Sequence, residues 1–201
     1  MSTETAHVHH EHPDVVGSRN RLGLALILVA DIAFTLSMVF VFFYLKSQNV
    51  NNMWLAKGDE DFPWIHPLSS WPAWRVTLIA GIGMTINYLG LLSVRKKNYS
   101  GLLLSSLIAM VASFVATYYQ WQTIAHAPFT FYMGGYVSAF YLLTTVNFAH
   151  LLITNFVTIG NWNRTRLGLY KTNHWHVDIL NVWWVWMTAS SALGAFCLLF
   201  G

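Results

Sequence analysis

Few residues of this sequence are suited to chemistry, and the most unusual one lies inside an apolar run. Asp31 falls near the middle of residues 22–45, where an unpaired charge in hydrocarbon would cost several kcal/mol. Loss of water favours the neutral form of a carboxyl group, so we expect Asp31 either to be protonated or to accept hydrogen bonds from a neighbouring helix. Thr35, one helical turn later, shares its face. Two interpretations remain open: Asp31 handles protons or contacts lipid, or it is a buried carboxyl group that fixes helix packing.

Histidine is the other residue type that could act within a membrane, as a proton carrier or a haem ligand. A membrane b-type haem usually takes two inward-facing histidines, but only His150 lies well within an apolar run. His126, His174 and His176 fall near predicted helix ends. The sequence therefore disfavours a haem held by this chain alone, and it predicts that His150 is a hydrogen-bonded packing residue.

The remaining residues suggest neither an enzyme active site nor a firm metal site. The polar tail, residues 1–21, contains imidazoles whose spacing could chelate a metal, although a solvated terminus is the simpler interpretation. These histidines are His7, His9, His10 and His12. The single cysteine, Cys197, permits neither a disulfide framework nor a thiolate metal site. The sequence has no nucleotide-binding loop, nucleophile motif or carboxylate cluster, so we predict no catalytic residue, no metal and no redox cofactor in this chain.

The elements that carry these residues are predicted to be membrane helices. Of the 201 residues, 55% are hydrophobic and only 9% are charged, whereas an ordinary soluble domain has roughly 25% charged residues. A spanning helix needs about 20 apolar residues, and five runs qualify: 22–45, 72–94, 101–124, 132–159 and 177–200. The sequence therefore predicts an all-α, polytopic bundle of five transmembrane helices, residues 22–201, preceded by the polar, histidine-rich tail.

The basic residues alternate along the chain in step with these five runs. Five crossings would place most of them on one side of the membrane, namely Arg19, Arg21, Arg95, Lys96, Lys97, Arg164, Arg166 and Lys171. Only Lys46, Lys57 and Arg75 would lie on the other side. By the positive-inside rule, the N-terminus is expected inside the cell and the C-terminus outside.

Two of the runs carry polar or small residues on one helical face. Ala80, Gly83, Asn87 and Gly90 share a face, so they predict a packing seam across which Asn87 forms a hydrogen bond. The run 132–159 has an apolar side that can face lipid and a polar stripe that must face protein. The stripe consists of Tyr136, Thr144, Asn147, Thr154, Asn155 and Thr158, with His150 at its margin.

Several stretches resemble, in the right order, one family of membrane proteins. ILVADIAFTLSMVFVFFYL is similar to a helix with an acid early in an aromatic-rich span, and WIHPL is similar to the loop that follows it. YVSAFYLLTTVNFAHLL is similar to the family's fourth helix, and APFT to the loop before that helix. The family is subunit III of the haem–copper oxidases, in its five-helix bacterial form. Matching positions include Asp31, His66, Gln120, Tyr136 and His150.

The chain also departs from that family pattern. Relatives often have a histidine where this sequence has Asn147. His174 and Asp178 fit the family's spacing of a histidine and an acid in the last loop, but the family's usual Trp-His-Phe-Val-Asp string is missing after Trp184. HWHVD at 174–178 mimics this string too early in the helix. Contacts that relatives make through the last helix are therefore not carried over.

The resemblance implies an accessory subunit of a respiratory terminal oxidase that is not itself catalytic. Haem and copper would be held by partner subunits I and II, and this chain would bind phospholipid and support proton uptake and stability during oxygen reduction. Asp31 would contact lipid or the catalytic subunit. Residues of polar packing or of a lipid cleft would be His66, Asn87, Gln120, Tyr136, Asn147, His150, His174 and Asp178. The implied location is the bacterial cytoplasmic membrane.

Three alternatives stay open at this point. One is a nitric oxide reductase accessory protein of the same family, and another is a haem-bearing membrane anchor. The third is a small transporter that uses Asp31 and the Asn147/His150 face. Five helices do not divide into two equal inverted halves, which weighs against the transporter.

Overall fold

The computed structural model describes residues 13–49, 54–55, 67–130, 133–171 and 173–201. Within these ranges all regular secondary structure is α-helical, and five helices are long and apolar enough to cross a membrane. This confirms the prediction of an all-α, five-helix membrane bundle. The helices are α1 (Pro13–Gln48), α2 (Trp71–Arg95), α3 (Tyr99–Ala125), α4 (Gly135–Arg166) and α5 (Trp175–Leu198).

Local sequence explains where several of these helices begin. Within the described residues, α1 extends from Pro13, ahead of the predicted start at residue 22, because a helix can continue beyond the apolar run. Asn98 caps α3 through its side chain, which accepts a hydrogen bond of 3.0 Å from the Gly101 amide. Gly134 precedes α4 with φ of 133°, a conformation that favours glycine.

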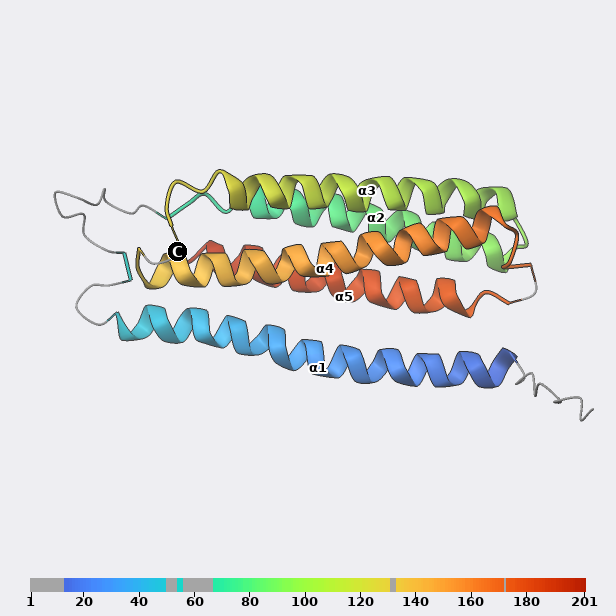
Figure 1. Cartoon of the computed structure of the whole chain (residues 1–201), viewed down its shortest axis with the longest axis horizontal. Helices are drawn as coiled ribbons and strands as arrows, with labels where there is room; N and C mark the ends of the chain where they lie inside the picture. The colour runs from blue at the N-terminus through green and yellow to red at the C-terminus, as the bar shows by residue number, and fades with distance from the viewer. Residues whose placement is uncertain (1–12, 50–53, 56–66, 131–132, 172) are drawn as a thin grey trace, which may run out of the picture.

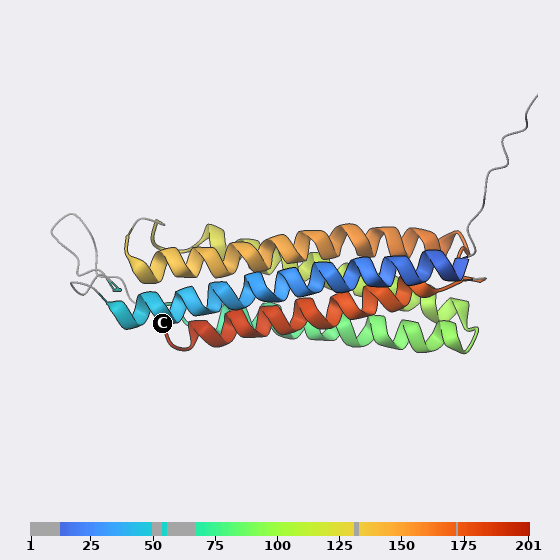
Figure 2. The same cartoon turned by 90° about the horizontal axis from the view of Figure 1, so that it is seen from below.

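Helices α2 to α5 form the body of the bundle, and α1 lies against one side of it (Figure 1). In the described part of the chain, α1 packs against α4 and α5 and against neither α2 nor α3. Figure 2 shows α1 running along the seam between α4 and α5. The helix-to-helix contacts of α1 are therefore made with α4 and α5.

The core divides along the bundle axis into three clusters of buried side chains. Aromatic residues dominate the end near the C-terminus, where Phe42 packs edge-on against Trp54 at 5.2 Å between ring centroids. Trp184, Met187 and Leu151 belong to the central cluster. Tyr170 belongs to the third cluster. It packs there with residues from the last part of α2 and the start of α3, namely Leu91, Val94 and Leu102. Apart from the residues that pack against these clusters, most side chains of α1 are apolar and exposed.

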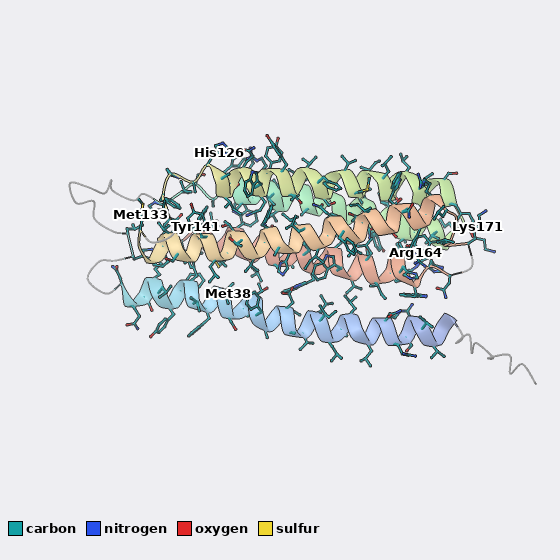
Figure 3. All side chains as sticks on the ribbon, viewed as in Figure 1. Met38, His126, Met133, Tyr141, Arg164 and Lys171 are labelled. Atoms are coloured by element: carbon teal, nitrogen blue, oxygen red, sulfur yellow. The ribbon has the colours of Figure 1, made fainter. Side chains whose placement is uncertain are left out.

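The two ends of the bundle differ in charge. Arg164 and Lys171 lie at the end where α1 begins, whereas His126 and Met133 lie at the opposite end (Figure 3). The C-terminus lies at the end opposite to the start of α1 (Figure 1). This arrangement is compatible with the basic segments sharing one side of a membrane; which side faces the cytoplasm stays a prediction from the positive-inside rule.

Candidate functional site

Asp31 lies at the point where α1, α4 and α5 meet. Its Oδ1 atom is 3.0 Å from Nε2 of His150 on α4. Its Oδ2 atom accepts a hydrogen bond of 2.5 Å from the indole nitrogen of Trp186 on α5. The side chain of Asp31 is 19% exposed and that of His150 is 6% exposed. Both carboxylate oxygens are therefore hydrogen-bonded, which offsets the cost of holding an acid in apolar surroundings.

His150 is held through both of its ring nitrogens. Nε2 faces Asp31, and Nδ1 lies 3.3 Å from the hydroxyl oxygen of Ser190 on α5. The Ser190 hydroxyl also donates to the carbonyl of Met187 at 3.0 Å. When that donation is made, Nδ1 acts as the donor to Ser190. When Ser190 donates to Nδ1 instead, the neutral imidazole donates to Asp31 through Nε2.

A second tryptophan of α5 braces the same turn of α4. The indole nitrogen of Trp183 donates to the Thr154 hydroxyl at 2.9 Å, and that hydroxyl donates to the carbonyl of His150 at 2.7 Å. The rings of Trp183 and His150 meet edge to face with centroids 6.0 Å apart. Trp183, Trp186 and Ser190 thus hold His150 and Asp31 from one helix.

Asp31, His150 and Ser190 have the residue types of a nucleophilic triad but not its geometry. In such a triad Nδ1 of the histidine faces the acid and Nε2 faces the serine, whereas here the two nitrogens are exchanged. Ser190 is buried, and the cavity it lines has a volume of about 20 Å³. A cavity of this size admits no organic substrate, so the arrangement supports a structural or proton-holding role.

Gln120 and Asn147 join α3 to α4. The Asn147 amide donates to Oε1 of Gln120 at 2.8 Å, and Nε2 of Gln120 donates to the carbonyl of Thr144 at 3.0 Å. Further along the helices, Asn155 donates to the hydroxyl of Thr117 at 2.9 Å. The polar stripe predicted for α4 is thus turned toward protein, while Phe156 on the opposite side is 79% exposed.

The small residues of α2 line close helix contacts. Asn87 is buried and donates to the side chain of Asn181 on α5 at 3.4 Å. A Cβ atom at Gly83 would lie 2.6 Å from the Trp184 ring, and one at Gly90 would collide with the hydroxyl of Ser105. Glycine at these positions allows α2 to approach α5 and α3 more closely than alanine would permit.

The candidate residues near the helix ends have different surroundings. Asp178 pairs with Arg95 of α2 at 3.0 Å and with Arg21 of α1 at 3.5 Å. His174 occupies the N-cap position of α5 without a side-chain capping bond. The Tyr136 hydroxyl accepts a hydrogen bond of 2.9 Å from the Leu68 amide. Tyr136 belongs to the aromatic cluster at one end of the bundle, whereas His174 and Asp178 lie at the start of α5, toward the other end. His66 lies outside the described residues.

The cavities of the described chain lie mainly at the bundle ends. One of about 370 Å³ is lined by Arg75, Gln122 and His126 at the end near the C-terminus. Another of about 360 Å³ lies at the basic end, where Arg164 borders an apolar lining that includes Gly160 and Phe156. Burial raises the pKa of Tyr170, beside Arg164, to about 12, so its phenol stays a neutral donor to Asn161 at 2.9 Å.

Sequence reasoning selected Asp31 and His150 but missed their partners on α5. Trp183, Trp186 and Ser190 recur at spacings of three and four, which places them on one helical face. This spacing could have indicated that the three side chains act on one neighbouring helix face, although an aromatic stripe at helical spacing ordinarily indicates core packing. Within the described residues, no group of three or more His, Cys, Asp or Glu side chains is placed to hold a metal ion.

Comparison with known proteins places the chain in one family. The model of the family described as "Cytochrome c oxidase subunit III" matches residues 1–189. A cytochrome c oxidase subunit 3 from Rhizopus stolonifer is 28% identical over 161 residues, covering 78% of this chain and 54% of that protein. The subunit 3 of Emericella nidulans is 26% identical over 171 residues, covering 83% of this chain and 61% of that protein.

A bacterial relative gives the same result over a longer alignment. The probable cytochrome c oxidase subunit 3 of Rickettsia felis is 24% identical over 196 residues, covering 89% of this chain and 66% of that protein. The chain thus spans between about half and two thirds of the length of these relatives. Because the family match extends over nearly all of the sequence and the five helices agree with it, the chain belongs to the cytochrome c oxidase subunit III family.

Proposed function

We propose that this chain is the accessory subunit III of a respiratory haem–copper oxidase in a bacterial cytoplasmic membrane. The family match carries this proposal, and the names of the curated relatives favour an oxidase over a nitric oxide reductase or a transporter. The family carries no haem or copper of its own. Subunits I and II would therefore hold the redox metals, and this chain would act by packing beside them.

The polar centre of the bundle supports a scaffolding role. Asp31 is the acid of α1 that joins this helix to both α4 and α5. Since α1 packs against no other helix in the described chain, this contact helps to fix the position of its apolar outer face. A firmly held outer face can present a constant surface to a partner subunit or to lipid. We propose that Asp31 serves the oxidase in this way rather than as a redox or catalytic group.

The proposed role predicts how an oxidase without this chain behaves. Oxidase complexes prepared with and without the subunit are compared for initial oxygen consumption and for loss of activity during sustained turnover. Without the subunit, we expect initial activity to persist but to decay faster, because proton uptake and packing around the catalytic subunit are less well supported. An unchanged decay rate would contradict the proposal. Complete loss of initial activity would also contradict it, because it would indicate a catalytic role.

The basic end of the bundle suits a bound phospholipid. The Arg164 side chain lines the cavity of about 360 Å³, and its buried Nε atom has no hydrogen-bond partner within the described structure. Apolar residues such as Phe156 and Ile179 line the same cavity. A guanidinium group beside an apolar channel fits the phosphate and acyl chain of one lipid. We therefore propose that phospholipid binds here.

A pair of arginine variants tests the lipid proposal. Arg164→Leu should reduce the phospholipid that the purified complex retains, because it removes the cation beside the cavity. Arg166→Leu is the matched control, since Arg166 is exposed and lies over the Trp162 ring, away from the cavity. Phosphorus analysis and lipid mass spectrometry measure the retained lipid. Equal retention in both variants would remove the support for this site.

A further inference from the structure

A small cavity lies beside the Asp31 site and is lined by α1, α4 and α5. Its volume is about 20 Å³, and its polar lining comes from Thr35, Asn147, His150 and Ser190. Apolar side chains complete the lining: Met38, Val39, Leu143 and Val146. Met38 marks the α1 side of this region in Figure 3. A cavity holds one water molecule when it offers roughly 10–15 Å³ and two to four polar partners, and this cavity meets both conditions.

Two buried polar atoms at this cavity lack a hydrogen-bond partner. The hydroxyl oxygen of Thr35 and the Oδ1 atom of Asn147 are both inaccessible, and neither forms a hydrogen bond in the described structure. Thr35 as a whole is 5% exposed. A buried polar group without a partner costs roughly 1–3 kcal/mol. Two such groups on residues that line one cavity therefore indicate a ligand that satisfies both.

The conformation of Thr35 strengthens this conclusion. Most threonines in these helices donate their hydroxyl to the carbonyl four residues earlier, as Thr77, Thr117 and Thr154 do. Thr35 could bond the Asp31 carbonyl in the same way, but its hydroxyl has no such bond. A threonine that gives up this local bond needs another partner. The amide group of Asn147 is oriented by its bond to Gln120, which leaves Oδ1 free.

We propose that this cavity binds a single ordered water molecule. The water accepts a hydrogen bond from the Thr35 hydroxyl and donates to Oδ1 of Asn147. Its second hydrogen is directed toward the Ser190 hydroxyl oxygen, which has lone pairs left after its contacts with His150 and Met187. This inference rests on the cavity and its lining, and it does not depend on the oxidase role.

The water would join two hydrogen-bonded groups that are otherwise separate. One group contains Asp31, His150 and Ser190, and the other contains Asn147 and Gln120. With the water in place, hydrogen bonds run without interruption from α1 through α5 and α4 to α3. Asp31 of α1 is then linked to the Gln120 amide on α3, a helix that α1 does not touch within the described chain.

A high-resolution electron cryomicroscopy map of the intact complex tests the proposal directly. We expect a density peak within hydrogen-bonding distance of the Thr35 hydroxyl and of Asn147 Oδ1. An empty cavity, or one filled by a lipid chain or a partner side chain, would overturn the proposal. This outcome needs no variant, so it holds even where a substitution impairs folding.

A threonine variant with a matched control gives a second test. Thr35→Val keeps the side-chain shape but removes the hydroxyl, so the peak should be lost or strongly reduced. Thr85→Val is the control, because the hydroxyl of Thr85 is exposed to the surroundings of α2 and donates to the Gly81 carbonyl. In infrared spectra, an O–H band that shifts in H₂¹⁸O should be present in the control and absent in Thr35→Val. A peak and band unchanged in Thr35→Val would refute the site.

Discussion

At the scale of residues, Asp31 is distinguished by having its two carboxylate oxygens bonded to two different helices. His150 on α4 and Trp186 on α5 each contact one oxygen. A carboxyl group in the membrane is costly unless its oxygens are satisfied, so each contact supports the position of the other. Asp31 therefore acts as a connector of three helices.

This connection predicts coupling between substitutions of its members. Asp31→Asn and Trp186→Phe should each destabilise the chain by about 0.6–2 kcal/mol, the range of polar contacts between membrane helices. The double variant should cost less than the sum, because Asp31→Asn replaces the carboxylate acceptor of their shared hydrogen bond by a weaker amide oxygen and Trp186→Phe removes its donor. Denaturant unfolding in mild detergent measures these free energies. Ser37→Ala, which removes only a bond to the Ala33 carbonyl within α1, is the control.

Strict additivity of the two substitutions would contradict the connection.

Asp31 and His150 were identifiable from the sequence, because ionisable residues inside apolar runs are rare. Their pairing was not, since it depends on how α1 crosses the bundle, and no local pattern encodes that crossing. Trp186 was hidden for a related reason: an indole that packs in a core and one that donates a hydrogen bond have the same sequence pattern.

At the scale of elements, the helices were predictable because the bilayer imposes their length. Each predicted run lies almost entirely within an observed helix, and the differences fall at the ends. The length of an apolar run matches the thickness of the hydrocarbon core of the bilayer, whereas the ends of a helix depend on caps and turns. The extension of α1 to Pro13 shows this, because the extra turns contain polar residues that a hydropathy pattern omits.

Close packing of α2 gives a prediction at the same scale. Gly83→Ala should destabilise the bundle by about 1–3 kcal/mol through overpacking, because the new Cβ atom would press on the ring of Trp184. Gly23→Ala in α1 is the matched control, since nothing lies within 4 Å of its Cβ position. Thermal unfolding of the two variants under one detergent condition makes the comparison. Similar losses in both variants would contradict the packing account.

At the scale of the whole molecule, the bundle leaves one large apolar surface on α1. Leu26, Val29 and Phe40 are more than half exposed there, while the opposite side of α1 contacts α4 and α5. Apolar helix surfaces in a membrane bind lipid or other helices. Under the proposed function, a neighbouring oxidase subunit would cover part of this surface and phospholipid the rest.

The ionisable residues within the described spans, chiefly Asp31 and His150, are engaged with each other and with α5. The family assignment could be proposed from sequence because several motifs occur in order, which no single residue would justify.

The most direct test of the account is isolation of the tagged chain from its native membrane in mild detergent, followed by mass spectrometry and visible absorption spectroscopy. We expect it to co-isolate with larger, haem-containing oxidase subunits, and to show no haem absorption once it is separated from them. Isolation without any such partner, or a stoichiometric haem band from the separated 22.9 kDa chain, would contradict the account.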